Sequence, residues 1–431
     1  MGTDPSGAGL GAAVFPMLAG LRNLTPQVNA ALRRQIEWLE RFGETSQDHQ
    51  DFYVNPYGRW AKRLYYEKPT LGKIFAAPLV FLEAFLPSTR ALFWGRQRLP
   101  IADAHYAMGF AFLHRLTGEK AYYDQSVHFL RVLIRTRCPG VKNYCWGYPF
   151  HWETVWGTFP SGTPIITTTP YCYEAFAEAH AIDGKQQWLE IMRSAADHAL
   201  SDFRENETGP GAAASSYTPL DARRVVNSNV YRAAMLTHAA QVFSHEPYWQ
   251  SAERNLNFVL QSQLPDGSWY YAMDPDRQGR FIDHFHTCFV LKGLLKIERF
   301  RDHAGLQEAI DRGLAYYLEN LIGPDGLPRP FAKAPRVTIY KRELYDYAEC
   351  INLLLMARNR GARFDAALRR VLEDLLARWQ RPTGAFRTRQ MLAGWNNVPM
   401  HRWGQSEMFR SLCLFLVSAK ECDTMGKETA C

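Results

Sequence analysis

The chain has 431 residues, of which 47% are hydrophobic and 22% are charged, the balance of an ordinary globular protein and not of a disordered or fibrous one. The formal net charge is +7, but no run of five or six basic residues occurs. Nucleic-acid binding therefore has little support, while an acidic small ligand stays open. None of the eight cysteines shows the spacing of a zinc site or a disulfide framework. We expect buried thiols in a reducing cytoplasm, with no metal and no cofactor.

The N-terminal segment carries no targeting pattern. The mildly apolar stretch 10–21 follows no basic region and precedes no small-residue cleavage site, so we expect no signal peptide. No apolar run reaches the roughly 18 residues that a membrane-spanning helix needs. We expect residues 1–25 to form an N-terminal tail of a protein without a transmembrane segment.

Three similar loops recur at intervals of roughly 60 residues, a period typical of repeat architectures. They are Gln-Leu-Pro-Asp-Gly-Ser-Trp at 263–269, Gly-Pro-Asp-Gly-Leu at 323–327 and Gln-Arg-Pro-Thr-Gly-Ala-Phe at 380–386. Each loop follows an amphipathic pattern. Before the last loop, apolar residues recur at i, i+3 and i+4 spacing from Phe364 to Trp379, which predicts a helix. The repeat unit is therefore a helical hairpin.

In chain order, the pattern predicts two alternating sets of helices. The outer set covers 26–43, 119–136, 185–203, 247–263, 304–320 and 363–380. The inner set covers 101–116, 168–182, 227–243, 283–300, 345–358 and 402–419. Six pairs close an all-α (α/α)6 barrel, and an open α-solenoid is the alternative. We expect one barrel domain over 26–420, with 44–100 inserted between the first outer and inner helices and 421–431 as a C-terminal tail.

The connections differ in length on the two faces of this barrel. Turns from inner to outer helices are short, whereas loops from outer to inner helices are long and rich in Gly, Pro and aromatic residues. Long loops of this kind are commonly functional. They fall on the face where all six inner helices begin. Because helix N-termini present unpaired N–H groups and the positive end of the dipole, this mouth favours a carboxylate or phosphate.

Polar and titratable residues stand at the start of every inner helix, where a helix that only packed a core would carry apolar ones. The candidate catalytic residues are Tyr173, Glu174, Asp283, His286, Asp346 and Tyr347. The candidate ligand-binding residues are Arg223, Arg224, Asn227, Asn229, Trp269, Tyr345, Arg402 and Trp403. A structural interpretation stays open, since Asn227 and Asp283 are good N-caps. His284 and His286 face different sides of a helix, so we expect one of them to be a hydrogen-bonded core histidine and not a metal ligand.

The segment 143–153, Asn-Tyr-Cys-Trp-Gly-Tyr-Pro-Phe-His-Trp-Glu, is the densest aromatic stretch of the chain. Flat rings cover the apolar face of a pyranose. We therefore expect a sugar-stacking lid that contains Trp146, Tyr148, His151, Trp152 and Glu153. The alternative is a hydrophobic plug that closes the barrel mouth.

Six short blocks follow one another over roughly 143–410. They are Cys-Trp-Gly-Tyr-Pro-Phe-His-Trp at 145–152, Pro-Ser-Gly-Thr-Pro at 160–164, Asn-Ser-Asn at 227–229, Pro-Asp-Gly-Ser-Trp at 265–269, Ile-Asp-His-Phe-His-Thr at 282–287 and Pro-Met-His-Arg-Trp-Gly-Gln at 399–405. In this order they resemble the VpsJ-like exopolysaccharide-biosynthesis family. The resemblance implies a six-hairpin, glycosidase-like barrel with a role in polysaccharide biosynthesis, but it names no reaction.

The chain departs from that family in two places. The family usually has Asp where this chain has His151 and Gln where it has Glu153, so no catalytic acid is carried over to position 151. The family also shows an Asp-x-His pair where this chain reads Tyr-Asp-Tyr at 345–347. That stretch, with Ile-Asn-Leu-Leu at 351–354, is weakly similar to the C-terminal segment of D-glucuronyl C5-epimerases.

The first candidate function is a uronate-type C5-epimerase or lyase acting on an acidic oligo- or polysaccharide, or on its lipid-linked precursor. Such chemistry needs a base at C5 and cationic or N–H donors for the developing enolate. Tyr347 is the leading candidate base, with His286 beside it. Arg223, Arg224 and Arg402 are candidates for holding the substrate carboxylate in bidentate fashion.

Two other classes stay open. A glycoside hydrolase needs two carboxylates across the scissile bond, and Asp283 with Glu174, Glu153 or Asp346 could supply them. A glycan-binding protein without catalysis also fits the departures from the family pattern. Isoprenoid cyclisation, suggested by the Pro-Asp-Gly-Ser-Trp loop, lacks an Asp-rich acid motif.

Overall fold

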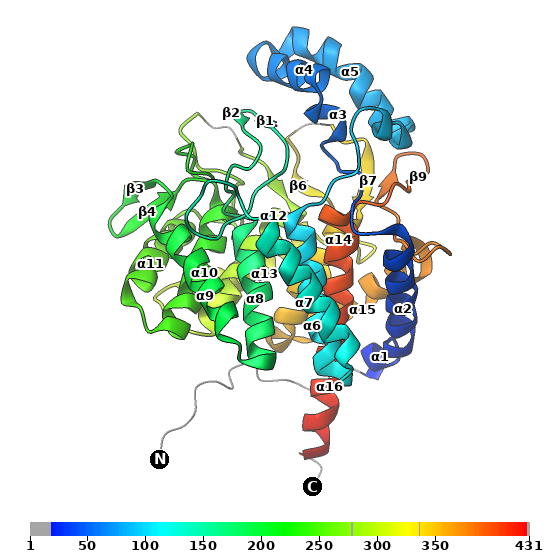
Figure 1. Ribbon diagram of the computed structural model, residues 1–431, viewed down its shortest axis with the longest axis vertical. Coiled ribbons are helices and arrows are strands. Elements are labelled where there is room, and N and C mark those ends of the chain that lie inside the picture. Colours follow the sequence, from blue (N-terminus) through cyan, green and yellow to red (C-terminus); the bar gives the residue numbers. More distant parts are fainter. Residues whose placement is uncertain (1–18, 277–278, 336, 429–431) are drawn as a thin grey trace.

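The computed structural model describes residues 19–276, 279–335 and 337–428, with side chains as far as residue 421. Six inner helices line an (α/α)6 barrel (Figure 1): α6 (Pro100–Thr117), α8 (Thr169–Asp183), α10 (Val226–Phe243), α12 (His284–Glu298), α14 (Leu344–Met356) and α16 (Ser406–Glu428). Six outer helices surround them: α2 (Thr25–Phe42), α7 (Lys120–Arg135), α9 (Gln186–Ser201), α11 (Glu246–Gln261), α13 (Leu306–Asn320) and α15 (Ala362–Asp374).

The inner helices form a closed ring. Each packs against its two neighbours, and α16 completes the circle by packing against both α14 and α6. The predicted all-α (α/α)6 barrel is therefore confirmed over the open solenoid. Helices α6 and α10 are buried along nearly their whole length, whereas α7 and α15 bury a single stripe. This is the patterning expected of an inner and an outer layer.

Tight turns connect inner helices to outer ones. Helices α6 and α8 end at Gly118 and Gly184, whose φ values of 76° and 66° lie in the left-handed region that glycine adopts without strain. The N–H of each glycine returns to the last helical turn, donating to the carbonyls of His114 and His180 respectively. The chain can therefore reverse within two residues and start the next outer helix.

The opposite face carries the long loops and all the strands among the described residues. The strands are β1 (Trp152–Thr154), β2 (Gly157–Phe159), β3 (Glu205–Gly209), β4 (Ala212–Ser215), β5 (Ile282–Asp283), β6 (Phe331–Lys333), β7 (Tyr340–Glu343), β8 (Arg389–Met391) and β9 (Trp395–Asn396). They pair antiparallel as β1-β2, β3-β4, β5-β6 and β7-β8-β9. Two of these sheets join separate loops, so they fix neighbouring loops to one another around the mouth.

The insertion at 44–100 is largely helical. It contains α3 (Asp51–Val54), α4 (Pro56–Glu67), α5 (Pro69–Phe85) and the 3-10 helix η2 (Pro87–Leu92). Helices α4 and α5 form a hairpin that stands above the loop face (Figure 1, blue, top). The remaining short elements are α1 (Ala19–Arg22), η3 (Arg358–Arg360), η4 (Leu375–Trp379) and η5 (His401–Gln405).

The chain ends differ from the expected tails. Helix α1 lies inside the predicted N-terminal tail, of which residues 1–18 lie outside the described part. The last inner helix starts at Ser406 instead of 402, because Arg402 (ψ 137°) and Trp403 (φ 56°) leave the helical conformation. It then continues to Glu428, through most of the predicted C-terminal tail. Within the described ranges, no helix is both long and apolar enough to cross a membrane.

Candidate active site at the barrel mouth

Asp283 and His286 form a hydrogen-bonded pair at the start of α12. Asp283 caps the helix, since its Oδ1 accepts from the His286 backbone N–H at 3.1 Å. Its Oδ2 lies 2.7 Å from His286 Nδ1. A carboxylate at Nδ1 selects the tautomer in which that nitrogen carries the proton and Nε2 carries the lone pair. The His286 side chain is 21% exposed, so a base stands partly open at the mouth.

Aromatic rings surround His286. The centroids of the Phe285 and Tyr271 rings lie 4.4 and 4.5 Å from its own, and that of Phe289 lies 5.6 Å away. The same hollow is lined by Asn227, whose buried Oδ1 has no hydrogen-bond partner among the described residues. Flat apolar surface, an unsatisfied amide oxygen and a base thus meet at a hollow of about 10 Å³, which has room for about one water molecule.

His284 takes the structural role that the sequence predicted for one of the two histidines. It is buried, its Nε2 lies 3.0 Å from the Tyr317 hydroxyl and its Nδ1 lies 3.1 Å from the Arg329 carbonyl. Burial lowers its pKa to about 3, so it stays neutral. The two histidines therefore face opposite layers of the barrel and share no ligand.

Asp346 lies at the start of α14 and is 2% exposed. Its Oδ1 has no hydrogen-bond partner in the described part of the chain. Burial raises the pKa of this carboxyl well above its usual range, and the neighbouring charges of Glu343 and Asp283 raise it further, against the opposing charge of Arg389. Burial and these charges therefore favour the protonated form of the Asp346 carboxyl.

His49, which sequence reasoning missed, belongs to the same region. It lies in the insertion, is 5% exposed, and neither ring nitrogen has a hydrogen-bond partner among the described residues. Burial lowers its pKa well below the usual value, with further lowering by Arg389, Arg90 and Arg402. Its ring lies 5.8 Å from that of Trp403. We call His49, Asp283, His286 and Asp346 the mouth cluster.

Trp403 and Tyr345 connect the members of the mouth cluster. Their rings are stacked at 6.0 Å, and Tyr345 in turn contacts Phe285 at 5.1 Å. Trp403 has a left-handed backbone φ of 56°. Residues other than glycine rarely adopt this conformation, and those that do are common at functional sites. Both residues therefore lie where the sequence placed them, at the mouth.

Arg402 is already bound within the chain. Its Nε and Nη2 donate to the two carboxylate oxygens of Asp48 at 2.8 and 2.5 Å, and both side chains are fully buried. Its guanidinium also lies 4.3 Å from the Tyr148 ring centroid and 3.9 Å from that of Trp403. The expected bidentate contact with a substrate carboxylate is thus made with Asp48, and Arg402 fixes the insertion to the mouth.

A cleft of about 510 Å³ opens beside the mouth, and we call it the rim cleft. It is lined by Trp156, Thr158, Asn206, Asp221, Arg223, Arg224 and Asp274. Arg223 donates to Asp276 at 2.7 Å and lies 5.2 Å from the Trp156 ring centroid. The half-buried Arg224 side chain makes no close ion pair or hydrogen bond within the described ranges, but its charge opposes the rise that burial causes in the pKa of Asp274, in the same cleft. The rim cleft therefore offers an unpaired cation beside an aromatic ring.

Several predicted site residues face away from the mouth. The Tyr347 hydroxyl donates to Asp374 at 2.7 Å, and its ring packs 4.5 Å from Trp379 in the outer layer. It therefore cannot act as a base at the mouth, and this expectation is corrected. The cause is the helical repeat, because neighbouring residues such as Asp346 and Tyr347 point about 100° apart.

Three further residues that we expected to bind the ligand form hydrogen bonds with backbone groups of the chain instead. Trp146 and Trp269 are buried and donate their indole N–H groups to the carbonyls of Leu133 at 2.8 Å and Val259 at 2.9 Å. The Asn229 amide bonds to both the N–H and the carbonyl of Ser215. The polar groups of all three are therefore engaged within the chain, although Trp269 also lines the hollow beside Asn227 and His286.

The aromatic segment 143–153 fits the predicted hydrophobic plug better than the predicted sugar-stacking lid. Trp146, Tyr148 and Phe150 are buried, whereas His151 is exposed and Trp152 is half-buried. Glu153 is buried and accepts from Arg59 at 2.8 Å and Arg63 at 3.1 Å, both on α4. Its carboxylate therefore anchors the inserted hairpin.

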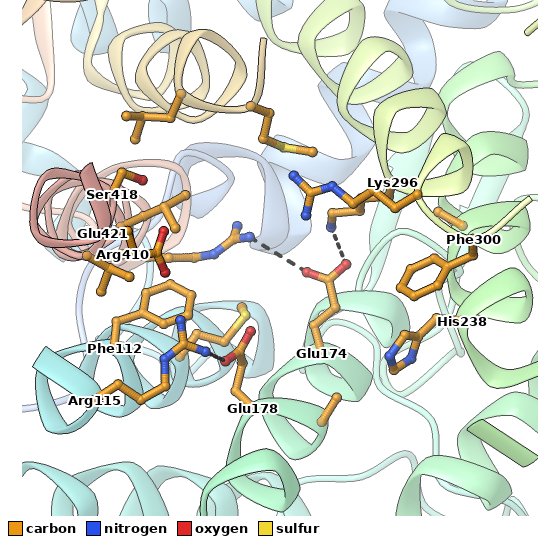
Figure 2. A pocket seen from close by; sticks show the side chains of 18 of the residues that line it. Phe112, Arg115, Glu174, Glu178, His238, Lys296, Phe300, Arg410, Ser418 and Glu421 are labelled. Atoms are coloured by element: carbon orange, nitrogen blue, oxygen red, sulfur yellow. Dashed lines mark hydrogen bonds and ion pairs between the residues drawn. The ribbon is translucent and has the colours of Figure 1, made fainter. Parts of the chain in front are cut away.

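Tyr173 and Glu174 belong to a second region, at the opposite end of the barrel interior. There a cavity of about 160 Å³ is lined by residues of all six inner helices (Figure 2), and we call it the lumen cavity. Glu174 forms ion pairs with Lys296 and, at 3.6 Å, with Arg410, and the Tyr173 hydroxyl lies 2.8 Å from His238 Nδ1. Neither residue reaches the mouth.

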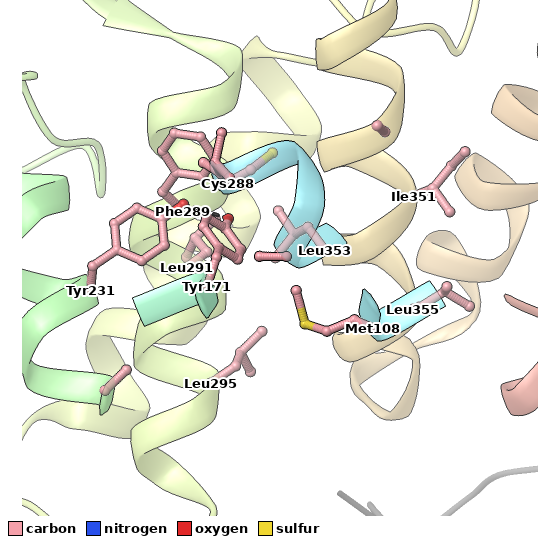
Figure 3. Close-up of a cluster of buried hydrophobic side chains, with 14 of the residues drawn as sticks. Met108, Tyr171, Tyr231, Cys288, Phe289, Leu291, Leu295, Ile351, Leu353 and Leu355 are labelled. Atoms are coloured by element: carbon pink, nitrogen blue, oxygen red, sulfur yellow. Dashed lines mark hydrogen bonds between the residues drawn. The ribbon is translucent and has the colours of Figure 1, made fainter. Parts of the chain in front are cut away.

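A layer of side chains separates the mouth from the lumen cavity (Figure 3). Tyr171 and Tyr231 join their hydroxyls at 2.6 Å, and Phe289 packs against Tyr231 on the mouth side. Tyr171 also contacts His105, which pairs with Glu407. The barrel axis is therefore filled at this level.

No protein-family model and no curated protein sequence matches the chain. Solved structures share its fold. A cellobiose 2-epimerase from Spirochaeta thermophila DSM 6192 superposes with a TM-score of 0.58 at 15% identity, covering 76% of this chain and 87% of that one. An unsaturated glucuronyl hydrolase specific for heparin covers 94% and 98%, with a TM-score of 0.58 at 12% identity. A polysaccharide lyase covers 75% and 90%, with a TM-score of 0.52 at 15% identity.

Proposed function

We propose that this protein moves a proton at a carbon of an acidic glycan, as a uronate-type C5-epimerase or lyase, with His286 as the base. The observation that carries the proposal is the Asp283–His286 pair, which leaves Nε2 free at the partly open mouth. An imidazole oriented by a carboxylate is a common general base. His286 thereby takes the role that we first expected of Tyr347.

The reaction begins with removal of the C5 proton by His286 Nε2. The C–H electron pair moves into the adjacent carboxylate as an enolate, and donors at the mouth stabilise the new charge. In an epimerase, an acid returns a proton to the opposite face of C5. In a lyase, the C4–O bond breaks instead, leaving a C4–C5 double bond and a protonated leaving group. Asp346 in its protonated form and neutral His49 are candidates for these later proton transfers.

Substrate charge fits the rim cleft. Arg224 offers an unpaired guanidinium there, and Trp156 offers a ring that Arg223 already covers in part. Guanidinium groups bind carboxylates through two parallel hydrogen bonds. The N-termini of the inner helices add a positive potential on the same face. A polymer with a carboxylate on successive sugars could therefore occupy the mouth and the rim cleft together.

The structural neighbours support the substrate class. Their names include epimerases of cellobiose, a polysaccharide lyase and a hydrolase of unsaturated glucuronyl units, so this fold hosts proton transfer on sugars. The resemblance to VpsJ-like proteins supports a place in exopolysaccharide biosynthesis in the cytoplasm, with a lipid-linked precursor as one possible form of the substrate. These finer assignments stay predictions.

A glycoside hydrolase is the second candidate, and Asp346 favours it. A carboxyl held protonated beside a second carboxylate, Asp283, is the arrangement of a general acid with its partner. We rank it second because Asp283 is engaged with both the backbone and the ring of His286. A glycan-binding role without catalysis is the third.

Incubation with uronic acid oligosaccharides in D2O distinguishes the three candidate functions. Deuterium at C5 in an intact chain indicates epimerisation, and an unsaturated uronate at a new chain end indicates a lyase. New reducing ends without exchange or unsaturation would replace our proposal with hydrolysis. Binding with none of these products would leave a glycan-binding protein.

A further inference from the structure

The inserted hairpin exposes an unusual amount of apolar surface. Among the described residues, thirteen large hydrophobic side chains are exposed, and nine of them fall between residues 57 and 92. They are Tyr57, Trp60, Leu71, Ile74, Val80, Phe81, Phe85, Leu86 and Leu92. Monomeric proteins rarely leave a contiguous patch of this kind without a partner.

Helix α5 arranges these side chains in a stripe. Leu71, Ile74, Pro78, Phe81 and Phe85 follow i, i+3, i+7, i+10 and i+14 spacing, which places them on one face of a helix, and all are exposed. Ile74 is 65% exposed and Phe85 is 66% exposed. The stripe therefore faces outward along the length of the helix and has no partner within the described chain.

The other face of α5 is held by a small core of its own. Leu79 is buried with Ala61 of α4 and Phe52 of α3. At Gly72 a Cβ atom would lie 2.1 Å from Tyr65 Cα, so the two helices touch through their backbones. The hairpin is thus a packed unit, and its outward stripe is a fixed feature.

Basic side chains flank the stripe. The segment 55–92 contains six Lys and Arg residues and two Asp and Glu residues, but Arg59 and Arg63 pair with Glu153 and Arg90 is buried. The acid Glu67 is exposed beside Lys68. Lys68 and Lys73 are exposed at the turn of the hairpin. Glu83, the acid on α5, pairs with Arg389 on β8 at 2.7 Å. The outward surface therefore combines aromatic and aliphatic groups with positive charge.

We propose that the α5 stripe and the flanking lysines dock on an anionic lipid membrane. Helix α5 is apolar on most sides, since one side packs on the hairpin core and the other exposes the stripe. An exposed apolar helix face with lysines beside it can lie in the membrane interface. The 17 residues of α5 would run along the surface, in keeping with the finding that no described helix can span a bilayer. Positive charge adds attraction to acidic head groups.

Charge argues against a second copy of the chain as the occupant. Two identical stripes packed in parallel would bring Lys68 and Lys73 of both copies together, whereas an anionic lipid surface attracts these lysines in any orientation. The membrane is therefore the occupant that the charges favour.

The ion pairs that anchor the hairpin to the barrel would also hold the mouth close to a membrane on which the hairpin docks. Glu153 on β1 binds Arg59 and Arg63 of α4, and Arg389 on β8 binds Glu83 of α5. Both contacts tie the hairpin to loops of the mouth, so a docked stripe would hold the mouth near the membrane. Resting on the proposed function, this geometry favours a lipid-linked acidic glycan as the substrate.

Sedimentation with vesicles tests the docking without any substrate. We expect the full chain to bind vesicles of phosphatidylcholine and phosphatidylglycerol at least tenfold more tightly than vesicles of phosphatidylcholine alone, with weaker binding at high salt. Phe81→Ser with Phe85→Ser, and separately Lys68→Glu with Lys73→Glu, should each reduce binding at least tenfold. The matched control replaces exposed apolar residues elsewhere, Leu392→Ser with Val337→Ser, and should bind as the parent does.

Other outcomes overturn the proposal. Equal binding by the parent and the Phe81→Ser, Phe85→Ser variant, or no binding by the parent, removes the membrane as the occupant. A parent that is dimeric by light scattering, with a monomeric variant, assigns the stripe to a second copy. Thermal unfolding checks that the variants stay folded. Because turnover of soluble oligosaccharides should be unaffected by these changes, failure of docking and failure of the proposed reaction can be told apart.

Discussion

The two ends of the barrel interior both contain titratable residues, but they differ in how those residues are satisfied. At the mouth, His49 and Asp346 are buried with nitrogen or oxygen atoms that have no hydrogen-bond partner among the described residues. Near the lumen cavity, Glu178 accepts from Arg115 at 2.8 Å, and Glu174 is held by both Lys296 and Arg410.

This difference separates a reactive site from a structural one. A buried polar atom without a partner costs about 1–3 kcal/mol, and such atoms are retained where a ligand or water completes them. Paired buried charges need no ligand, because each neutralises the other within the protein. The lumen network is therefore interpreted as part of the barrel core, and the mouth cluster as the place of chemistry.

The largest effect should come from the mouth. We expect His286→Gln to lower kcat for proton exchange by about 10²- to 10⁴-fold, the usual contribution of a general base, with little change in stability because the side chain is partly exposed. The matched control is His284→Gln, two residues earlier on the same helix. It should lower the midpoint of thermal unfolding and spare the kcat of the folded protein. The reverse result would place the base elsewhere.

The buried ion pair between Glu349 of α14 and Lys292 of α12, which does not line the lumen cavity, should respond in the opposite way. Glu349 is fully buried and forms an ion pair with Lys292, which is 5% exposed. Glu349→Gln leaves that ammonium buried without its carboxylate, which should cost about 3–5 kcal/mol in urea unfolding. Lys292→Met with Glu349→Leu should recover much of the loss, since the charge is removed with its partner. A loss of activity in a fully folded Glu349→Gln protein would assign the pair a catalytic role.

The rim cleft should affect binding more than turnover. The Arg224 side chain makes no close ion pair or hydrogen bond in the described part of the chain, so Arg224→Ala should leave stability unchanged. Losing a hydrogen bond to a charged group should raise KM for an acidic oligosaccharide roughly tenfold, with kcat nearly constant. Arg223→Ala is the comparison, since that guanidinium already pairs with Asp276, and its effect on KM should be smaller. Unchanged KM in both variants would remove the cleft from the substrate path.

Tyr347 provides the test of a corrected expectation. Its hydroxyl donates to the carboxylate of Asp374, so Tyr347→Phe should cost about 1.5–3 kcal/mol of stability. Proton exchange by the folded variant should equal that of the parent. If exchange is lost while stability is kept, the hydroxyl must reach the mouth in solution and the geometry described above fails.

Helix periodicity explains what could be predicted from the sequence. The inner and outer helices follow from apolar spacing and from loops repeated along the chain, and the ends of all but α15 and α16 lie within a few residues of those expected. The direction of a side chain at a helix start is harder to predict, because one residue turns it by about 100°. Asp346 reaches the mouth for this reason while Tyr347 faces Trp379.

No local sequence pattern indicates which residues of the insertion contact the mouth. His49 lies outside every periodic segment, and its place follows only from tertiary contacts such as the ion pair between Asp48 and Arg402. The arginines Arg59 and Arg63 gave no sign that they would bind Glu153. Contacts between segments about 90 to 350 residues apart depend on the closed ring, which a periodic pattern indicates but does not detail.

Asp51 should change the pH dependence of stability beside the mouth and leave the chemistry at the mouth unchanged. Burial and the neighbouring charge of Asp48 raise its pKa from 3.8 to about 7. The folded protein therefore binds this proton more tightly than the unfolded chain does. Its contribution is fully present below about pH 4 and is lost as the pH rises towards 7, with a slope of at most about 1.4 kcal/mol per pH unit.

Asp51→Asn keeps the shape of the side chain and removes this titration. The stability of the parent minus that of the variant should therefore fall between pH 4 and pH 7 and be flat above it, as measured by urea unfolding. Buried histidines with lowered pKa values, such as His49 and His105, act in the opposite direction, since they stabilise as pH rises. They are present in both proteins and cancel in the difference. A difference that rises with pH would mean that Asp51 is held ionised, with Arg90 outweighing Asp48 and burial.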